Sequence, residues 1–512
     1  MANPVWSQFQ HLGVVVDIPP EQVPEDRWTD AINFKFQNRA SERIGGYNQF
    51  AGTPSVAPIF ALNLIRGPNS YWIYCSTTAV WVTDGTAHWN ITPAGLALCA
   101  AGDWTGTILN GIPVLNNTTS PPFSWNGNTA NICTTIPGWP VGALCGAIRA
   151  FKYHLFAIAP VEGGITFGSS IWWSDAADPG TLPSAWTPTP ANDAGDLVLG
   201  DTIGNCIDAL ALRDALMVYK SQSVYVINYV AGQYVYTARK LFLTAGVQAR
   251  NCIAEISGEH WVWTGIDLIR HDGQQFRSTL QDKVKEKVAQ SIDPSKIQLI
   301  HVMPRLLNTQ CWLMIPTQGQ TWCDQAVIVN TDTEDCGLRL LPTVAFVARG
   351  LINKGVVGIS WASDTNPWNT DITAWNQQNF DPTSDSALMC DAGDVKLWQV
   401  DGTDSENGAP VSAFVERQSL PLQNPLLRNI VLRVVPRIEG EVGEVIYIRV
   451  GGQPNFGTPV TWSPSEPFVI GTTVACNFQT EGRLISVRFQ GSTMRTWKIH
   501  SYRIESVEQG LY

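Results

Sequence analysis

Six aspartates lie in and just after the segment "IWWSDAADPGTLPSAWTPTPANDAGDLVLGD" (171–201). They are Asp175, Asp178, Asp193, Asp196, Asp201 and Asp208. A glycosidase needs two carboxylates at a defined separation, one of them with a raised pKa. The stretch "SDAADPGTLPSAW" is also similar to the Asp-box turn of sialidases, but its Ser-x-Asp spacing differs and no second copy follows. Catalysis by these aspartates is therefore the less favoured interpretation.

Calcium binding is a second chemistry open to this stretch. Calcium takes six to eight oxygen ligands, usually from alternating acidic positions in a tight loop. "DAADPG" and "NDAGD" supply several such oxygens, but neither has the twelve-residue helix–loop–helix spacing. Asp, Pro, Gly, Ser and Asn are also what a long loop between strands requires. We expect such a loop, with Trp172, Trp173 and Trp186 folded back onto the sheets, and calcium remains the alternative.

No other catalytic constellation is evident. Glu259 and His260 are adjacent in an expected strand, which places them on opposite faces, and they do not form an H-E-x-x-H motif. "GISWAS" around Ser360 lacks the second glycine and the strand–helix context of a nucleophile elbow. The eleven cysteines contain no C-x-x-C pair. We therefore expect no catalytic residue, cofactor or metal.

Composition limits the remaining classes of function. The formal net charge is −11, and charged residues make up 15% of the chain, against roughly 25% in an average soluble protein. Tight binding of phosphate groups needs clustered Lys and Arg, so this composition disfavours tight nucleic-acid binding. The first twenty residues lack the features of a signal peptide, and no long apolar run could span a membrane. We expect synthesis in a reducing cytoplasm, buried thiols and no stable membrane insertion.

Strands followed by tight turns recur along most of the chain. "VWVTDGTAHWNIT" (80–92), "FSWNGNTANI" (123–132) and "LIRHDGQQFRST" (268–279) place D-G or N-G between apolar runs, and "KLWQVDG" (396–402) ends in the same turn. Such dipeptides are the strongest short signal for a β-hairpin. The spacing of about 40 to 60 residues suits propeller blades. We predict an irregular β-propeller over residues 51–410, with about six to eight degenerate blades.

One helix is expected to interrupt the strands. In "STLQDKVKEKVAQSIDPSK" the apolar residues Leu280, Val284, Val288 and Ile292 fall one helical turn apart. Ser278 or Thr279 could cap its start, and Pro294 would end it. This predicts one short helix inserted in or between blades.

The two ends of the chain differ from the middle. Pro19, Pro20 and Pro24 prevent an early helix, so residues 1–50 are predicted to form an extended lead-in that includes the half-buried strand "INFKF". Residues 411–512 alternate strongly between polar and apolar, which predicts an antiparallel β-sandwich or barrel. We expect its solvated face to carry Arg433, Arg449, Arg483, Arg488, Arg495 and Arg503.

The chain resembles the tail nozzle or hub proteins of short-tailed phages, the group that includes tail tubular protein B and the packaged-DNA stabilisation proteins. The likeness lies in a strand ending in "WSD", an acidic Pro-rich loop, and then "LRDALMVY" and "SVYVINY" (212–229). "EKVAQSID" and the ending "FQTEGRLISVRFQGS…TWKIHSYRIE" are similar to the helix and the C-terminal β-domain of that family. The resemblance is spread over most of the chain, and no single motif carries it.

The resemblance implies a structural virion protein made in the host cytoplasm. It would form a homohexameric ring below the portal–adaptor neck, retain the packaged genome, let DNA pass without gripping it, and offer attachment sites to tail fibres or spikes. The family brings no catalytic residues. Two alternatives remain: a receptor- or glycan-binding tail module, and a propeller glycan hydrolase.

Overall fold

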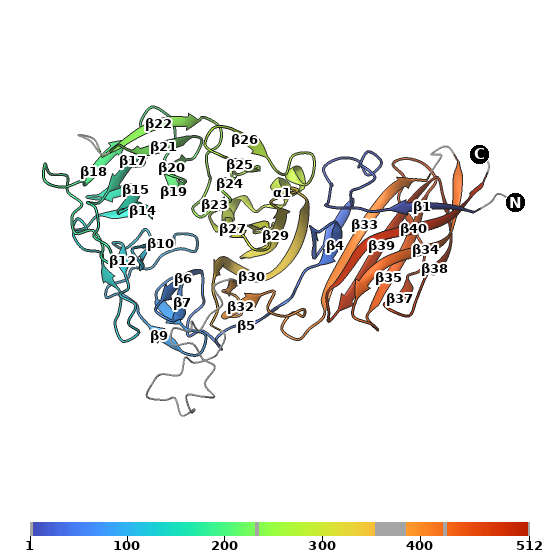
Figure 1. Cartoon of the computed structure of the whole chain (residues 1–512). Coiled ribbons are helices and arrows are strands. Elements are labelled where there is room, and N and C mark those ends of the chain that lie inside the picture. The colour runs from blue at the N-terminus through green and yellow to red at the C-terminus, as the bar shows by residue number, and fades with distance from the viewer. Residues whose placement is uncertain (1–3, 231–234, 354–385, 423–426, 510–512) are drawn as a thin grey trace, which may run out of the picture.

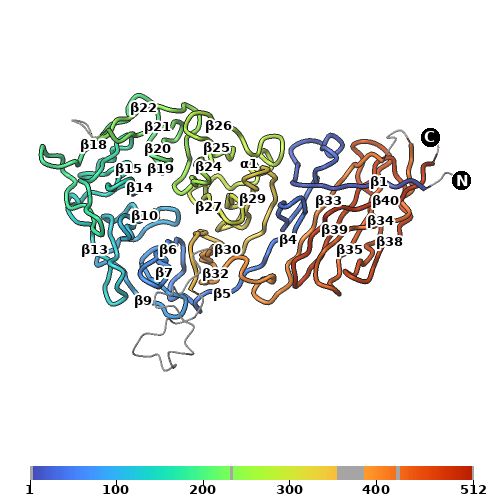
Figure 2. Tube along the Cα trace, in the orientation of Figure 1, coloured from blue at the N-terminus to red at the C-terminus, as the bar shows by residue number. Residues whose placement is uncertain are grey.

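The computed structural model describes residues 4–230, 235–353, 386–422 and 427–509. Nearly all of the regular structure consists of strands, arranged as a ring of small sheets beside a two-sheet sandwich (Figure 1). The predicted all-β class, with a propeller, one short helix and a C-terminal sandwich, is confirmed. The chain trace places both termini at the end of the sandwich that lies away from the ring (Figure 2).

Five blades are complete antiparallel sheets formed by consecutive strands. The first two are β6 (Phe60–Arg66), β7 (Asn69–Cys75), β8 (Val80–Thr83) and β9 (His88–Asn90), then β10 (Thr105–Leu109), β11 (Ile112–Asn116), β12 (Phe123–Ser124) and β13 (Thr134–Thr135). Blade 3 contains β14 (Leu144–Phe151), β15 (His154–Glu162), β16 (Ile165–Thr166), β17 (Ser170–Trp173) and β18 (Gly195–Val198). Blades 4 and 5 are β19 (Cys206–Leu212), β20 (Ala215–Lys220), β21 (Val224–Tyr229) and β22 (Tyr236–Phe242), then β23 (Ile253–Ile256), β24 (Glu259–Trp263), β25 (Leu268–His271) and β26 (Phe276–Ser278).

The last two blades share one long strand. They comprise β27 (His301–Arg305), β28 (Gln310–Ile315), β29 (Cys323–Asn330), β30 (Cys336–Gly350), β31 (Ser386–Asp391), β32 (Lys396–Val400) and β5 (Tyr47–Gln49). The first part of β30 pairs with β29 and ends blade 6, and after a register shift its second part pairs with β31 and begins blade 7. Strand β5, from the start of the chain, pairs with β32. The innermost strands contact one another in the cyclic order β6, β10, β14, β19, β23, β27 and β30, which closes a seven-bladed ring in the described part of the chain.

The D-G turns act as predicted at two hairpins. Gly85 and Gly273 adopt φ of 99° and 89° between β8 and β9 and between β25 and β26. The N-G turn at Asn126 does not join two adjacent strands directly. Asn126 accepts a hydrogen bond from the N–H of Asn128, and Asn128 accepts one from Ala130. These bonds hold a loop, so the partner of β12 begins only at Thr134.

The first fifty residues are not only an extended lead-in, because the strands within them complete other sheets. One sandwich sheet contains β3 (Phe34–Gln37), β4 (Ala40–Arg43), β40 (Trp497–Gln509), β34 (Arg428–Gly440) and β38 (Cys476–Gly482), with β1 (Val5–Phe9) on β40. The other contains β2 (Asp30–Ile32), β33 (Val411–Pro421), β39 (Leu484–Thr493), β35 (Val445–Gln453), β36 (Thr461–Trp462) and β37 (Glu466–Val469). The N-terminal strands therefore supply backbone partners that the C-terminal strands would otherwise lack.

Asn33 lets the chain cross between the two sandwich sheets and also ties the sandwich to the ring. Its φ of 61° turns the backbone between β2 and β3. Its amide donates to the carbonyl of Ser412 in the sandwich, and its side-chain oxygen accepts from the N–H of Leu340 in blade 6. One side chain thus contacts both parts of the fold.

The inserted helix is shorter than predicted. Helix α1 spans Lys285–Ser291 and is followed by the 3-10 helix η1 (Pro294–Leu299). All four residues of the predicted apolar face are buried. Asp282 has a φ of 59°, which interrupts helical geometry and delays the start of α1. Ser278 caps only the preceding turn, by accepting a hydrogen bond from the N–H of Gln281.

The helix start is instead capped by Asp17 from the N-terminal segment. Its two carboxylate oxygens accept hydrogen bonds from the N–H groups of Glu286 and Lys287, at 2.8 and 3.0 Å. We expect Asp17→Ala to lower the free energy of unfolding by about 1 kcal/mol, measured by urea titration. Glu25→Ala, on the same segment and exposed, is the control and is expected to leave stability unchanged. Equal midpoints for the two variants would contradict this role for Asp17.

Candidate functional site

The six aspartates singled out in the sequence have different partners. Asp175 holds its own loop by accepting hydrogen bonds from the N–H groups of Ala176 and Asp193. Asp201 contacts Tyr225 and forms an ion pair with Lys240 at 3.2 Å. Asp178 and Asp196 are exposed, and Asp208 is buried in a separate strand. The segment 174–194 connects β17 to β18 within blade 3.

The tryptophans of this segment pack inward as expected. Trp186 is buried and meets Trp139 edge-on, with ring centroids 4.7 Å apart. Trp173 is buried and donates a hydrogen bond from its indole to the carbonyl of Asp193. Trp172 is half-buried. The rings of Trp173 and Trp186 are therefore covered and are not free to stack on a sugar.

Asp208 takes part in a buried polar cluster that joins four blades. Its carboxylate binds Arg149 bidentately, with both N–O distances 2.7 Å. Arg149 also donates to the carbonyl of Gly106 and to the side-chain oxygen of Asn251, whose N–H donates to Asp208. These residues belong to β10, β14 and β19 and to the start of blade 5. This Arg149–Asp208 cluster fixes the inner strands relative to one another.

His260 lies in a hydrogen-bond chain between blades 4 and 5. The N–H of Gly273 can only donate, so Nδ1 of His271 accepts, and the Nε2–H of neutral His271 donates to the Tyr219 hydroxyl at 2.6 Å. Tyr219 in turn donates to Nδ1 of His260 at 2.7 Å, and Nε2–H of His260 donates to the carbonyl of Ala211. Burial lowers the pKa of His260 to about 3 and that of His271 to about 4. This series of hydrogen bonds is complete only when both histidines are neutral. Glu259, beside His260 in the sequence, instead pairs with Arg270 on the surface side.

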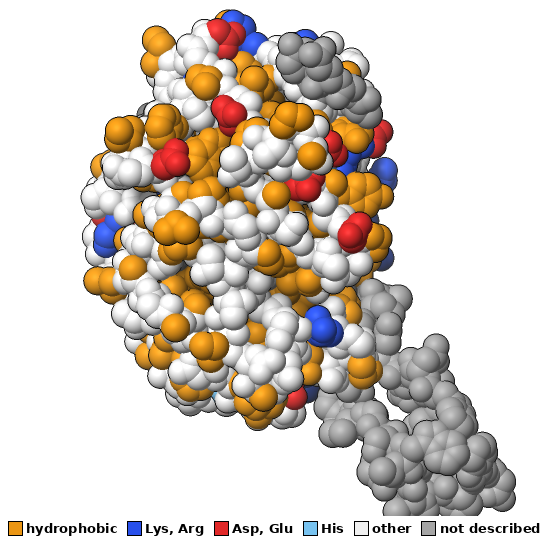
Figure 3. All heavy atoms as spheres, turned by 90° about the vertical axis from the view of Figure 1, so that its left-hand side faces the viewer, with side chains coloured by type: hydrophobic (Ala, Val, Ile, Leu, Met, Phe, Trp, Pro, Cys, Tyr) orange, Lys and Arg blue, Asp and Glu red, His pale blue; other side chains and the backbone are white. Residues whose placement is uncertain are grey.

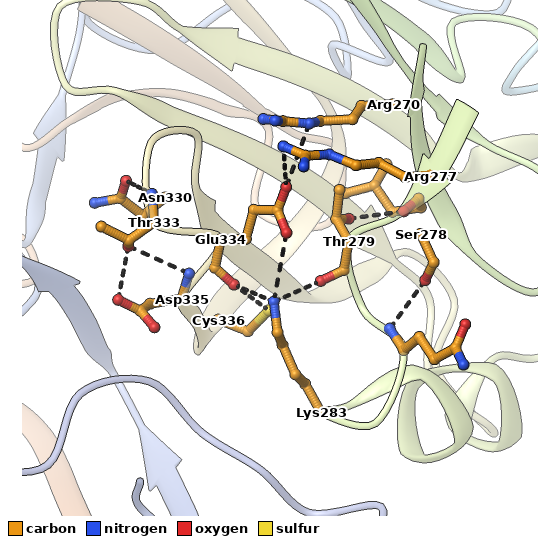
Figure 4. Close-up of polar contacts among 12 residues, drawn as sticks. Arg270, Arg277, Ser278, Thr279, Lys283, Asn330, Thr333, Glu334, Asp335 and Cys336 are labelled. Carbon is orange, nitrogen blue, oxygen red and sulfur yellow. Dashed lines mark hydrogen bonds and ion pairs between the residues drawn. The ribbon is translucent and has the colours of Figure 1, made fainter. Parts of the chain in front are cut away.

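A second polar cluster joins blades 5 and 6 at their outer edge. The backbone of Glu334 has a φ of 58°. Its carboxylate forms ion pairs with Arg270, Arg277 and Lys283, at N–O distances of 3.3, 2.9 and 3.8 Å (Figure 4). Lys283 also donates to the backbone carbonyls of Thr279 and Glu334. The basic side chains converge on a carboxylate that already neutralises part of their charge, so the cluster serves to join the two blades.

The cysteines and metal-ligating residues give no further site in the part of the chain that the structure describes. All eleven cysteines are buried and unpaired. Among the described residues, no three His, Cys, Asp or Glu side chains are grouped so as to hold a metal ion. Within the described ranges, no helix has the length and apolarity needed to cross a membrane. Ser360 lies outside the described residues.

The predicted arginines of the sandwich are mostly held on the surface by local partners. Arg433 pairs with Glu505 at 3.1 Å, and Arg495 with Glu441 at 2.9 Å. Arg488 pairs with Glu416 at 3.1 Å and lies over the ring of Phe414. Arg449 and Arg503 donate to Ser463 and Gln8, and Arg483 lies over Phe456.

Blades 1 and 2 form a surface with almost no charge, which sequence reasoning missed. From residue 44 to residue 148 the chain carries three charged side chains, namely Arg66, Asp84 and Asp103. We call these residues the neutral segment. The signal is visible in the sequence, because three charged side chains in this segment are far fewer than the chain's average of 15% charged residues would give. Leu98, Ile132 and Val141 in this segment are largely exposed.

The outer edge of blade 2 is hollowed. A groove of about 610 Å³ runs beside the two-residue strands β12 and β13, lined in part by Ile112, Ile132, Pro137 and Leu182. Apart from Ala130, the other described residues of its lining are polar and uncharged. The view from the side away from the sandwich shows apolar side chains spread over this end and few lysines or arginines (Figure 3). This surface is the candidate interaction site.

Comparisons with known proteins give no relative by sequence. No family model matches the chain, and no curated protein matches it. Among solved structures, it is similar to a fungal copper alcohol oxidase at 7% identity and a TM-score of 0.36, with both chains covered completely. An exo-β-1,3-galactanase from Phanerochaete chrysosporium matches at 8% identity and a TM-score of 0.28, over 90% of this chain and all of that one. A putative exported protein from Bacteroides fragilis matches at 9% identity and 0.29, over 60% and 88%. Likenesses this weak carry no argument about activity.

Proposed function

We propose that the chain is a structural subunit of a virion tail, the nozzle or hub of a short-tailed phage. It would act as a rigid wall element and not as an enzyme. Its partners would be neighbouring copies, the portal–adaptor neck, and tail fibres or spikes. The observation that carries the proposal is the neutral segment, because it is the kind of surface that an assembly subunit buries.

Charge depletion is the physical link between this surface and assembly. The cores of protein interfaces are poor in charged residues, because a charge buried there without a partner is costly. Copies of a chain with a net charge of −11 repel one another wherever their acidic surfaces meet. A contact through the neutral segment avoids both costs. Its exposed apolar side chains add the burial that stabilises an interface.

Any part of the neutral segment that the contacts between copies leave uncovered would suit a wall beside DNA. Its only cation is Arg66. Each phosphate that a protein neutralises adds salt-dependent affinity, so a wall without Lys and Arg lets DNA slide. We expect the channel lining of the assembled ring to be neutral or acidic.

Mass photometry of the purified chain, alone and mixed with its neck complex, tests the proposal. We expect the neck to gain about six copies, the number that the proposed homohexameric ring requires. The variant Ile132→Glu/Val141→Glu places two carboxylates on the neutral segment and is expected to raise the apparent Kd for the neck at least tenfold, about 1.4 kcal/mol. Val442→Glu/Val474→Glu, on exposed sites of the sandwich, is the matched control. A neck that gains no mass from the unaltered chain contradicts the proposed function.

A further inference from the structure

A cavity of about 370 Å³ opens at one end of the propeller ring. Cys145 and Cys206, near the starts of inner strands β14 and β19, form part of its wall. Arg250 and Gln298 reach it from the loop before β23 and from η1. Its volume lies within the range of about 300 to 1,000 Å³ that small-molecule sites occupy.

The lining is polar but carries a single charged side chain. Amide and hydroxyl groups come from Thr118, Thr166, Asn205, Gln248 and Gln298. Among the described residues that line the cavity, Arg250 is the one that is ionised, and none carries a carboxylate. Amides and hydroxyls both donate and accept hydrogen bonds, so this set suits a ligand rich in hydroxyl groups.

Arg250 has hydrogen-bonding capacity left over. Its Nη1 lies 3.3 Å from Asp103, and its buried Nε–H has no hydrogen-bond partner among the residues that the structure describes. An unused buried donor on a charged group is costly unless a partner arrives. A carboxylate is the acceptor that a guanidinium binds best, through parallel N–H···O bonds.

We propose that this cavity binds a small polyhydroxylated carboxylic acid, a sugar acid, with its carboxylate on Arg250. The amide side chains of Asn205, Gln248 and Gln298 bind its hydroxyl groups. The ligand chemistry is shared by a free sugar acid and by the terminal acidic residue of a polysaccharide. The inference goes beyond the structural role and is tested on the free chain, so its outcome does not depend on assembly with a neck.

Isothermal titration of the whole chain with D-glucuronate and with D-glucose tests the proposal. The two probes differ only in the carboxylate, and glucuronate is expected to bind at least about tenfold more tightly, because charge-assisted hydrogen bonds are the stronger ones. A disaccharide ending in glucuronate separates the sources: tighter binding than the monosaccharide indicates a polysaccharide end, and weaker binding indicates the free acid. The absence of saturable heat with glucuronate up to about 10 mM overturns the proposal.

Two variants locate the site. Arg250→Gln keeps a hydrogen-bonding side chain without the charge and is expected to weaken glucuronate binding about tenfold or more. Arg213→Gln, at an exposed arginine outside the cavity, should bind like the unaltered chain. Should Arg250→Gln fail to fold, Gln248→Glu at an exposed lining position adds a repelling carboxylate and is expected to abolish binding. Unchanged glucuronate affinity in Gln248→Glu, or in a folded Arg250→Gln, overturns the proposal.

Discussion

Arg149→Met is expected to lower the free energy of unfolding by about 3 to 5 kcal/mol. The substitution leaves the Asp208 carboxylate buried without the cation that binds it bidentately. Among the described residues, Asp208 then keeps the backbone N–H groups of Asn251 and Ala209 as its donors. Removing one partner of a buried ion pair costs more than removing both, because the remaining charge stays out of water. Gly106 and Asn251 also lose a donor.

Urea unfolding followed by tryptophan fluorescence measures this effect. The double variant Arg149→Met/Asp208→Leu removes both charges and is expected to recover most of the lost stability. Arg495→Met, which removes one partner of an exposed ion pair, is the matched control and should cost at most about 1 kcal/mol. If Arg149→Met is as stable as Arg495→Met, the Arg149–Asp208 cluster does not hold the blades together.

Acidification from pH 7 to pH 5 is expected to lower the free energy of unfolding by about 2 kcal/mol for each neutral buried histidine. Burial lowers the pKa of His11 and His260 to about 3 and of His271 and His301 to about 4. The unfolded chain takes up protons near pH 6.5 while the native chain does not, so stability is highest above pH 6.5. It is lost progressively as the pH falls from 6.5 toward 4.

Unfolding midpoints in urea at pH 7, 6 and 5 test the sign and the size. His271→Gln removes one titrating group from the hydrogen-bond series through Tyr219. The free energy of unfolding of this variant should therefore fall less steeply with acid than that of the unaltered protein, although it is lower at pH 7. His500→Gln changes a half-exposed histidine that pairs with Glu439, and it should keep the steep dependence. Equal stability of the unaltered chain at pH 7 and pH 5 would contradict neutral histidines in its interior.

Local features of the fold were predictable because neighbouring residues determine them. The turns at Gly85 and Gly273, the buried face of α1 and the alternating C-terminal strands follow from short-range patterns. The acidic loop between β17 and β18 was also predictable, because its residue types are those that turns require. The pairing of β5 with β32 was not, because it joins residues about 350 positions apart and leaves no local signature.

The candidate sites divide in the same way. The neutral segment is evident from the sequence, because it is defined by the near absence of Asp, Glu, Lys and Arg over residues 44–148. The partnership of Asp208 with Arg149 depends on which inner strands become neighbours, and the cavity around Arg250 depends on where separate loops end. Neither follows from spacing. The helix cap at Asp17 is of the same kind, since its partners lie some 270 residues away.

The pairing of the N-terminal strands with the last strands has a consequence for synthesis on the ribosome. Strands β1 to β4 leave the exit tunnel first, but β33, β34 and β40, on which the sandwich depends, are translated last. During elongation the growing chain therefore holds Trp28, Phe34 and Phe36, all buried in the finished protein, without their final neighbours. A chain that stops near residue 410 could still close the ring through β5, yet it would present unpaired, apolar strand edges to other nascent chains. Premature termination is thus expected to give an aggregation-prone product even though the strands of its propeller are all present.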